Sequence, residues 1–598
     1  MTIRPHADAD ADTDANSGHP GDEHNNSDAL STFLSGLEFD RGAPQALRQA
    51  AAQQDSVRFV RLWFDQLTCR IDSNNRQLPR KAFEWIAVQP NLSAAWRAAT
   101  RTQTANQPAQ GRPTIGGRDP HRSPLPYLTR LEPGASDGDL LAALALLGLP
   151  TPPHRTIQWL TAWKNVIQLT ATRSLSPELA FTTGLLLAPL KGTARLRQDG
   201  RRALQEELLE RTDTDGTPHA GILADLPEWL GSLVRSEYWG RRLASPTWNT
   251  TAKKRFDRLV ALTNSLYRHP NRLALSKRPT RGLRELLDEA NRLATHPNQP
   301  TRTQSDWAHV AMLQCDTPTR TPALLVTHDG PKPELDLSVD GRSLLQDAWS
   351  IRVTCGHSDW VLDDWTCVCW QSDDDADYIE LQADAGQGRR VDRQILLSRS
   401  EELLVLADVV INTPASPDTD QPANTTPLTV RSSLGLAHGV VAGPARTGRR
   451  DWKIKGVGGV ARILPLALPD DPLLATGRSS IDCHDRRLEW THAGTGPALY
   501  LPLVIDFSKH RSRSRPEWNR LTVTENRQVV STQQAVGFRA RLGDSQLVLY
   551  RSLAPPLTPR SVLGLHTQHE TVIGLLESNG DFRGLVMVEP TGRALPTS

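Results

Sequence analysis

The stretch from residue 364 to residue 410 constrains the fold more than any other part of the chain. Its apolar and β-branched runs predict strands at about Thr366–Trp370, Tyr378–Ala383 and Arg393–Ser398, and the last run continues through a Ser-Arg-Ser turn into Leu403–Val410. Acidic residues and glycines separate these runs, as expected of turns between strands. The stretch therefore predicts a β domain, although it does not indicate a reaction.

Two kinds of periodicity divide the rest of the chain. Short runs rich in Val, Ile, Leu, Thr and Trp recur from Val310 to Glu589, which predicts an antiparallel β-sandwich or barrel. Upstream, apolar residues recur at helical spacing in segments at 136–147, 154–170, 198–211, 220–242, 251–267 and 281–294. We therefore expect a helical domain over 29–305, built from antiparallel pairs, and a β domain over 306–598.

The first 28 residues differ from the rest in composition. Residues 1–28 alternate Asp with Ala and predict a disordered acidic tail. Three histidines in it, His6, His19 and His24, could bind a metal ion, but the composition favours a solvated tail. The N-terminus lacks the apolar core of a secretory signal, and no apolar run is long enough to span a membrane. These features predict a soluble cytoplasmic protein, or a periplasmic one if the true start lies elsewhere.

Charge and cysteine content exclude several classes of function. Lys and Arg number 69 against 67 Asp and Glu, so no global electrostatic drive toward nucleic acid is expected. Six cysteines in 598 residues are too sparse for a disulfide scaffold, although one long-range disulfide stays open. Cys367 and Cys369 are too close together for a zinc knuckle. The sequence contains no P-loop or HExxH motif and no strong spacing of metal ligands, so we predict no metal and no cofactor.

Two basic clusters are the strongest binding candidates that the residues themselves offer. They lie at 446–456 and 509–518, and each combines Arg or Lys with a Trp. One interpretation is a groove for an acidic polysaccharide, because Arg forks bind carboxylate or sulfate. The other is a pair of solvated loops. RNA binding is disfavoured, because no nucleic-acid module accompanies the clusters. The candidate substrate-binding residues are Arg446, Arg449, Arg450 and Lys453.

Three sequence blocks, in order along the chain, resemble a known family. They span residues 204–230, 328–347 and 364–410, and the matching positions in the last two are His328, Asp329, Gly341, Asp347, Asp377, Tyr378, Arg393 and Asp408. The chain resembles the heparinase II/III-like polysaccharide lyases. That resemblance implies an incomplete α/α toroid followed by an antiparallel β-sandwich. We interpret the positions of the third block as structural, with Tyr378 in the sandwich core or at a strand edge.

The resemblance also implies a chemistry, the β-elimination of uronic-acid polysaccharides. A base removes the proton next to the carboxylate, neutralising groups stabilise the enolate, and an acid protonates the leaving oxygen. The family places Tyr-His after the Asp-Gly turn, whereas this chain continues from Gly216 with Thr-Pro-His-Ala. His219 and His328 are then the candidate acid and base, with Tyr238 as a distant substitute. Each also has a structural interpretation: a helix start, a strand-end loop and helix packing, respectively.

Two functions therefore remain open. The chain binds and cleaves an acidic polysaccharide in a cleft between its domains, or it is a non-catalytic relative that keeps the scaffold for carbohydrate or protein binding. In the first case His219 and His328 should converge beside Arg or Asn. No oligomeric state is predicted.

Overall fold

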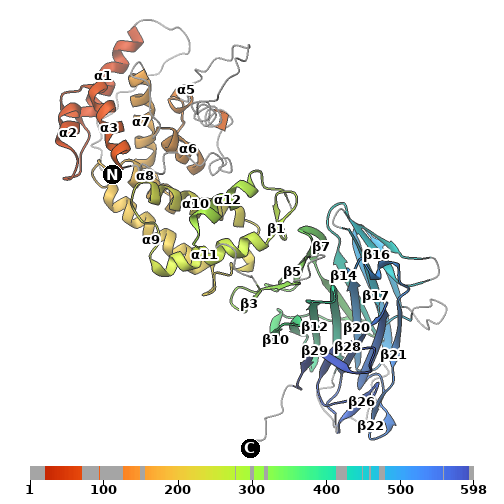
Figure 1. The fold of residues 1–598 in the computed structure, drawn as a ribbon. Helices are drawn as coiled ribbons and strands as arrows, with labels where there is room; N and C mark the ends of the chain where they lie inside the picture. Colours follow the sequence, from red (N-terminus) through yellow and green to blue (C-terminus); the bar gives the residue numbers. More distant parts are fainter. Residues whose placement is uncertain are drawn as a thin grey trace, which may run out of the picture. The chain divides into compact units, whose positions relative to one another are not determined.

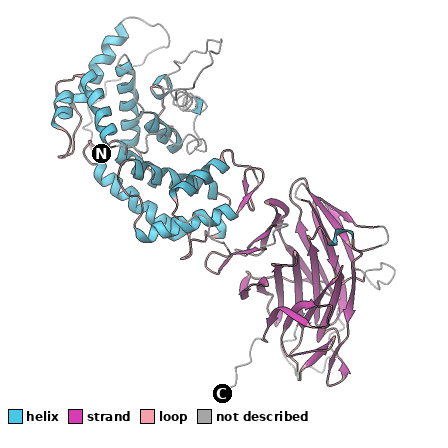
Figure 2. Cartoon of the chain, viewed as in Figure 1, coloured by secondary structure: helices cyan, strands magenta, loops and turns pink. Residues whose placement is uncertain are grey.

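A computed structural model describes most of the chain, and its contacts divide it into two units. The structure describes residues 21–70, 93–94, 125–147, 155–276, 278–295, 302–315, 321–412, 427–446, 449–456, 459–469, 479–556 and 558–590. The helical unit comprises Met1–Gly216, Asp225–Ala261 and Thr280–Asn298. The strand unit comprises Thr217–Ala224, Leu262–Pro279 and Gln299–Ser598. Figures 1 and 2 show helices in the first unit and strands in the second.

The helices come first along the chain. They are α1 Gly21–Ser35, α2 Gln45–Ala52, α3 Ser56–Arg70, α5 Leu125–Leu128, α6 Asp137–Leu147, α7 Thr156–Ala171, α8 Pro177–Leu186, α9 Thr193–Arg211, α10 Leu226–Arg242, α11 Thr250–Ser265 and α12 Leu283–Leu293. All six predicted helical segments contain a helix. The sequence did not predict α8, which is buried on every side and so lacks an amphipathic period.

Local sequence explains where α6 and α10 begin. Ser136 and Asp139 cap α6 reciprocally, because the Asp139 amide donates to Ser136 Oγ at 3.1 Å and the Ser136 amide donates to Asp139 Oδ2 at 2.9 Å. The predicted helix over 220–242 is two elements. A short 3-10 helix, η3 Ala220–Ile222, precedes α10, which starts at Leu226 with Pro227 in its first turn.

The strand unit contains six antiparallel sheets among the described residues. A central sheet has the order β10-β11-β12-β13-β20-β17-β16-β15. The others have the orders β18-β19-β14-β8-β9, β21-β24-β25-β28-β29, β3-β4-β5-β6-β7, β23-β22-β26-β27 and β1-β2. The bounds of the strands in the first half of the unit are β1 Tyr267–Arg268, β2 Arg272–Leu273, β3 Thr303–Ser305, β4 Val310–Gln314, β5 Pro322–Thr327, β6 Glu334–Val339, β7 Arg342–Ala348, β8 Ser350–Cys355, β9 Ser358–Asp359, β10 Thr366–Ser372, β11 Ala376–Asp384, β12 Arg389–Ser398 and β13 Leu403–Asn412.

The second half of the unit completes these sheets. Its strands are β14 Pro427–Gly435, β15 Val441–Pro444, β16 Trp452–Gly456, β17 Gly459–Pro465, β18 Ser480–His484, β19 Arg487–Thr495, β20 Ala498–Asp506, β21 Glu517–Leu521, β22 Val523–Glu525, β23 Gln528–Val529, β24 Ala535–Leu542, β25 Ser545–Ser552, β26 Arg560–Val562, β27 Leu565–Thr567, β28 Thr571–Leu576 and β29 Phe582–Val588.

The central sheet is buried on both faces. Alternate residues of β13 enter two different cores: Leu404 and Leu406 pack with the sheets that contain β5 and β14, whereas Val405 and Ala407 pack with the sheet that contains β25. Burial on both faces explains why the 364–410 stretch reads as long apolar runs. The predicted order, helices followed by an antiparallel β-sandwich, is confirmed.

Other sequence predictions have mixed outcomes. Residues 1–20 of the predicted tail lie outside the described residues, and α1 begins at Gly21 within its last part. The division near residue 305 is more complex than predicted, because Thr217–Ala224 and Leu262–Pro279 belong to the strand unit. The six cysteines are all described and form no disulfide. Within the described chain, no helix combines the length and apolarity that crossing a membrane requires.

Candidate functional site

Three histidines of the strand unit lie in a row. The rings of His219 and His309 are 5.6 Å apart between centroids, and those of His309 and His328 are 5.1 Å apart, both edge to face. His219 reaches this row because the Ala220 amide donates to the Ala308 carbonyl at 2.8 Å, which ties η3 to the turn before β4. The structure thus links the two predicted histidines through His309, which the sequence analysis did not single out.

His219 is the accessible end of the row. It precedes η3, and its Nδ1 accepts the Gly221 amide at 3.1 Å, so the predicted role as a helix-start residue is also present. Its side chain is 31% exposed, and Nδ1 lies 3.9 Å from Oδ2 of Asp329. Trp307 packs edge to face against it at 5.4 Å and is itself 46% exposed. An imidazole, a carboxylate and an indole therefore share one surface.

His309 is held by the turn between β3 and β4. Its φ of 53° is unusual for a residue with a side chain, and its carbonyl accepts the His328 amide at 3.0 Å. Its Nδ1 is buried and has no hydrogen-bond partner among the described residues. Such an atom is able to bind a ligand or solvent, as are several other buried polar atoms of the described chain.

His328 is the buried end of the row. The residue is 2% exposed, its Nδ1 lies 3.3 Å from the Trp365 carbonyl, and its Nε2 has no partner within the described chain. Burial lowers the pKa of His328, against the opposing effect of that carbonyl. The neutral imidazole is therefore favoured. Because the side chain is enclosed, the position of His328 does not support its predicted role as an acid or base in contact with substrate.

The surroundings of the row are acidic. Asp306 and Asp329 both act electrostatically on His328. Burial raises the pKa of the Cys367 thiol to about 12, and Asp306 adds to that shift. Cys367 is therefore an unreactive thiol rather than a nucleophile. An acidic environment around imidazoles favours a bound cation.

Tyr238 belongs to the helical unit. It lies on α10, is completely buried, and its hydroxyl accepts a hydrogen bond from Arg242 at 2.6 Å. Burial raises the pKa of this phenol. The packing interpretation of Tyr238 fits these contacts, and a phenol enclosed in this way offers no exposed base.

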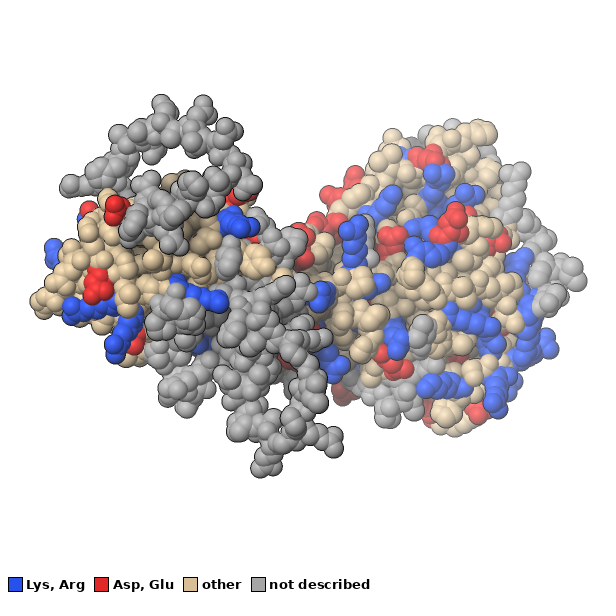
Figure 3. Space-filling model, turned by 90° about the horizontal axis from the view of Figure 1, so that it is seen from above, with Lys and Arg blue, Asp and Glu red and all other residues tan. Residues whose placement is uncertain are grey.

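The structure brings the two basic clusters together. Arg449 donates to the Pro516 carbonyl at 2.7 Å and lies over the Trp518 ring, while Arg462 donates to the Ser512 and Ser514 carbonyls, each at 2.7 Å. Of the four predicted substrate-binding residues, Arg446 is exposed, whereas Arg449, Arg450 and Lys453 are partly buried. Figure 3 shows Lys and Arg interspersed with Asp and Glu on the face in view.

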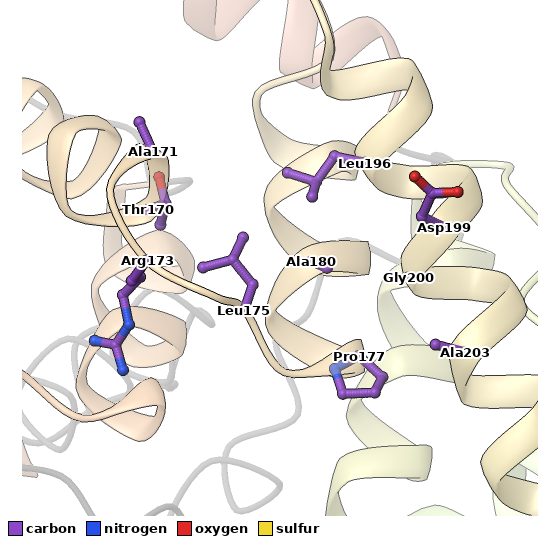
Figure 4. Close-up of a pocket in the computed structure, with 10 residues that line it drawn as sticks. All are labelled: Thr170, Ala171, Arg173, Leu175, Pro177, Ala180, Leu196, Asp199, Gly200 and Ala203. Atoms are coloured by element: carbon purple, nitrogen blue, oxygen red, sulfur yellow. The ribbon is translucent and has the colours of Figure 1, made fainter. Parts of the chain in front are cut away.

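The helical unit has a pocket of its own. It has a volume of about 370 Å³ and is lined by Thr170, Ala171, Arg173, Leu175, Pro177, Ala180, Leu196, Asp199, Gly200 and Ala203 (Figure 4). The guanidinium of Arg173, which lines this pocket, already forms an ion pair with Asp137 at 2.8 Å. No histidine, cysteine or tyrosine lines it, so it offers no group suited to proton transfer near neutral pH.

Sequence reasoning missed His309 and Trp307. The segment Asp306-Trp307-Ala308-His309 directly precedes a predicted strand and contains no recognisable motif. One signal was available, since turns that position exposed aromatic and imidazole groups beside a strand carry binding residues more often than strand interiors do. Its neighbours His219 and Asp329 come from other loops, and no spacing in the sequence reveals that.

Comparison with known proteins identifies the fold. No model of a known protein family matches the sequence, and no curated protein matches it. Among solved structures, the heparan sulfate lyase HepC from Pedobacter heparinus superposes with a TM-score of 0.53 at 10% identity, covering 88% of this chain and 99% of that one.

Two further structures agree with this match. A heparinase III gives a TM-score of 0.53 at 9% identity over 86% of this chain and 99% of that one, and another heparinase III gene product gives 0.54 at 10% identity over 88% and 99%. At such identity the similarity establishes the fold alone. The chain has a heparinase III-like fold, an incomplete α/α toroid followed by an antiparallel β-sandwich.

Proposed function

We propose that this chain binds an acidic, uronic-acid-containing polysaccharide on the surface formed by His219 and Trp307, and that it cleaves the polymer by β-elimination. The main support for this proposal is the contact between the rings of His219 and Trp307, whose centroids are 5.4 Å apart. This contact occurs in a fold that is shared with a heparan sulfate lyase. The fold supplies the class of substrate, and the two rings supply a place on this chain where a sugar could be bound and protonated.

Trp307 provides the binding surface. Its indole is 46% exposed, which is unusual for so large an apolar side chain. A flat aromatic ring with one open face packs well against the apolar C–H face of a pyranose, while its neighbours contact the hydroxyl groups. A sugar stacked there would lie beside the imidazole of His219.

His219 acts as the proton donor. Its Nδ1 accepts the Gly221 amide, so the neutral ring carries its proton on Nε2. The His219 side chain is 31% exposed, so its Nε2–H group is a candidate donor to the leaving glycosidic oxygen. His309, the next imidazole inward and partly buried, is the candidate base in place of the enclosed His328.

The joined basic clusters supply a second contact for an acidic polymer. Lys509, Arg513 and Arg515 are exposed on the segment that Arg449 and Arg462 hold in place, and Arg446 is exposed nearby in the first cluster. Guanidinium groups bind sulfate and carboxylate in a forked geometry. These exposed cations, rather than the partly buried Arg449, would contact the chain of sugars.

One observation favours binding without cleavage. His328 is 2% exposed and Tyr238 is completely buried, so two of the three groups predicted for proton transfer are enclosed. A protein that keeps Trp307 and the exposed arginines would still bind an acidic glycan. This is the second candidate function, a non-catalytic carbohydrate-binding relative.

The decisive experiment measures cleavage and binding on the same samples. The full chain is incubated with heparan sulfate, chondroitin sulfate and alginate, with the absorbance of the unsaturated uronate product recorded, and binding to each polymer is measured by calorimetry. The variants are His219→Ala and Trp307→Ala. The matched control is His357→Ala, which removes an exposed histidine in the β8–β9 turn.

The outcomes separate the two functions. Product formed by the wild type and by His357→Ala but not by His219→Ala supports cleavage with His219 as donor. Binding without product, weakened by Trp307→Ala, supports the binding protein. Absence of binding to all three polymers at low salt contradicts both.

A further inference from the structure

Three loops of the strand unit bring together a set of metal-binding side chains. His219 precedes η3, His309 precedes β4, and Asp329 follows β5. One ligand atom from each of these side chains lies within 4.8 Å of the other two. We propose that His219, His309 and Asp329 form a binding site for a divalent transition-metal ion of the zinc type. The inference does not depend on the proposed glycan function.

The donor set suits such an ion. Two imidazole nitrogens and one carboxylate oxygen are typical zinc ligands, whereas magnesium and calcium prefer oxygen alone. Three protein ligands leave a fourth tetrahedral position open to solvent or to a ligand group. A zinc ion with bonds of about 2.0–2.1 Å holds its ligand atoms roughly 3.4 Å apart. The side chains must therefore approach by about an ångström, which rotation of the partly exposed His219 and Asp329 allows.

The backbone around the cluster is fixed independently of any ion. The turn of His309 is tied to His219 through the hydrogen bond between Ala220 and Ala308, and to the segment of Asp329 through the His328 amide. Next to it, β4 and β5 pair from Val310 and Thr327 onward. Metal binding therefore does not require the three loops to be brought together first, which lowers its entropic cost.

Gly221 keeps the entrance of the cluster open. A Cβ at this position would lie 3.3 Å from Nδ1 of His219 and 3.6 Å from Oδ2 of Asp329. Any side chain there would crowd the space between the two exposed ligands. The φ of Gly221 lies outside the left-handed region that favours glycine, so the backbone does not require a glycine here. What the glycine provides is free space beside the two exposed ligands.

Two polar groups of the cluster, the imidazole of His309 and the carboxylate of Asp329, lack partners that structural polar groups usually have. Nδ1 of His309 is buried without a hydrogen-bond partner among the described residues. No lysine or arginine in the described part of the chain pairs with Asp329, whose side chain is 44% exposed. A bound cation would satisfy both the nitrogen lone pairs and the carboxylate charge.

The ion and the proposed cleavage are tested by separate measurements, because ion binding is measured in the absence of any glycan. If the chain cleaves no glycan, the measurement of ion binding is unaffected. The failure of either proposal can therefore be recognised separately.

The test measures zinc binding by calorimetry on the full chain without an affinity tag, after dialysis against a chelator. Cobalt serves as a second probe, because its visible absorption reports tetrahedral coordination. The variants are Asp329→Asn, His309→Ala and Gly221→Ala. The control is His357→Ala, and circular dichroism verifies folding. Asp329→Asn is the most informative, because an exposed, isosteric change should leave the fold intact.

We expect one zinc ion per chain in the wild type and in His357→Ala. Asp329→Asn should weaken binding by about tenfold or more, since even indirect supports of a metal site contribute about 10–100-fold. His309→Ala should abolish the cobalt spectrum. The proposal is overturned if the wild type binds no zinc, or if its affinity is unchanged in Asp329→Asn. Binding that persists in all three variants would reside elsewhere, for instance at the histidines of residues 1–28, and would also overturn it.

Discussion

Two polar constellations of the strand unit differ in how deeply they are buried and in whether their charges are paired. Arg393 of β12 is 0% exposed, yet it pairs with Asp408 of β13 at 2.9 Å and donates to the Trp349 carbonyl at 2.6 Å. The rings of Trp349 and Trp365 enclose its guanidinium at 4.3 and 4.4 Å. Asp408 also accepts a hydrogen bond from Ser432.

The cluster of His219, His309 and Asp329 is the opposite case. Its members come from three loops, two of them are partly exposed, and the buried Nδ1 of His309 has no partner among the described residues. A buried charge that is paired with an opposite charge belongs to the fold, because removing one partner is costly, even though Nη2 of Arg393 has no hydrogen-bond partner among the described residues. Polar groups that converge on a surface without a lysine or arginine partner are suited to a ligand. The comparison predicts that Arg393 contributes to stability and that the histidine cluster binds a ligand.

The largest effect should come from breaking the buried pair. Arg393→Ala leaves Asp408 charged and enclosed, which typically costs about 3–5 kcal/mol of unfolding free energy. Chemical denaturation followed by tryptophan fluorescence is suitable, because Trp349 and Trp365 flank the arginine. As the matched control, the double change Arg393→Met and Asp408→Leu removes both charges and should recover much of the loss. If the single and double variants were equally destabilised, the loss would not come from the unpaired charge of Asp408.

Zinc should produce the next largest effect, and only through the histidine cluster. At a free concentration of 100 times its Kd, an ion that binds the folded state alone adds about 2.7 kcal/mol to the unfolding free energy. We expect this gain in the wild type, its reversal by a chelator, and its absence in His309→Ala. Thermal denaturation with and without zinc measures it. A gain of the same size in His309→Ala would place the ion at another site.

The fold was largely predictable from the sequence, whereas the site was not. Strands β10, β11, β12 and β13 contain the four runs predicted within 364–410, because each is an apolar run between turn-forming residues, a signal contained within the strand itself. The third sequence block was also interpreted correctly as structural, since Tyr378, Arg393 and Asp408 are all buried.

The histidine row depends on tertiary structure instead. His219 approaches His309 only because Thr217–Ala224 leaves the helical unit and bonds to the turn before β4. Nothing in the composition or spacing of either segment encodes that path. For the same reason the sequence did not show that the two basic clusters, at 446–456 and 509–518, form one surface. Contacts between loops that are distant in the sequence can be recognised only in the tertiary structure, and the site consists of such contacts.

A smaller effect should follow from removing the exposed indole. Trp307→Ala loses a side chain that is half exposed already, so the unfolding free energy should change by less than about 1 kcal/mol. Polysaccharide binding should weaken about tenfold, because burying the exposed half of a large side chain contributes roughly 1–1.5 kcal/mol. Calorimetric titration with heparan sulfate measures the affinity, and Val361→Ala, another exposed apolar residue, is the control. Unchanged affinity in Trp307→Ala would exclude this surface as the glycan site.

The smallest effect separates two arginines of one basic cluster. Arg446 is exposed, so Arg446→Ala should leave stability unchanged and weaken binding of a sulfated polymer by a few-fold at low salt only, as expected of a screened surface charge. Arg449 bonds to the Pro516 carbonyl and pairs with Asp451 at 3.4 Å, so Arg449→Ala should lower thermal stability first. Affinity measured at two salt concentrations, beside melting curves, distinguishes them. If Arg449→Ala weakened binding without changing stability, a partly buried, paired arginine would be a ligand contact. Burial and charge pairing would then no longer separate structural from binding residues in this unit.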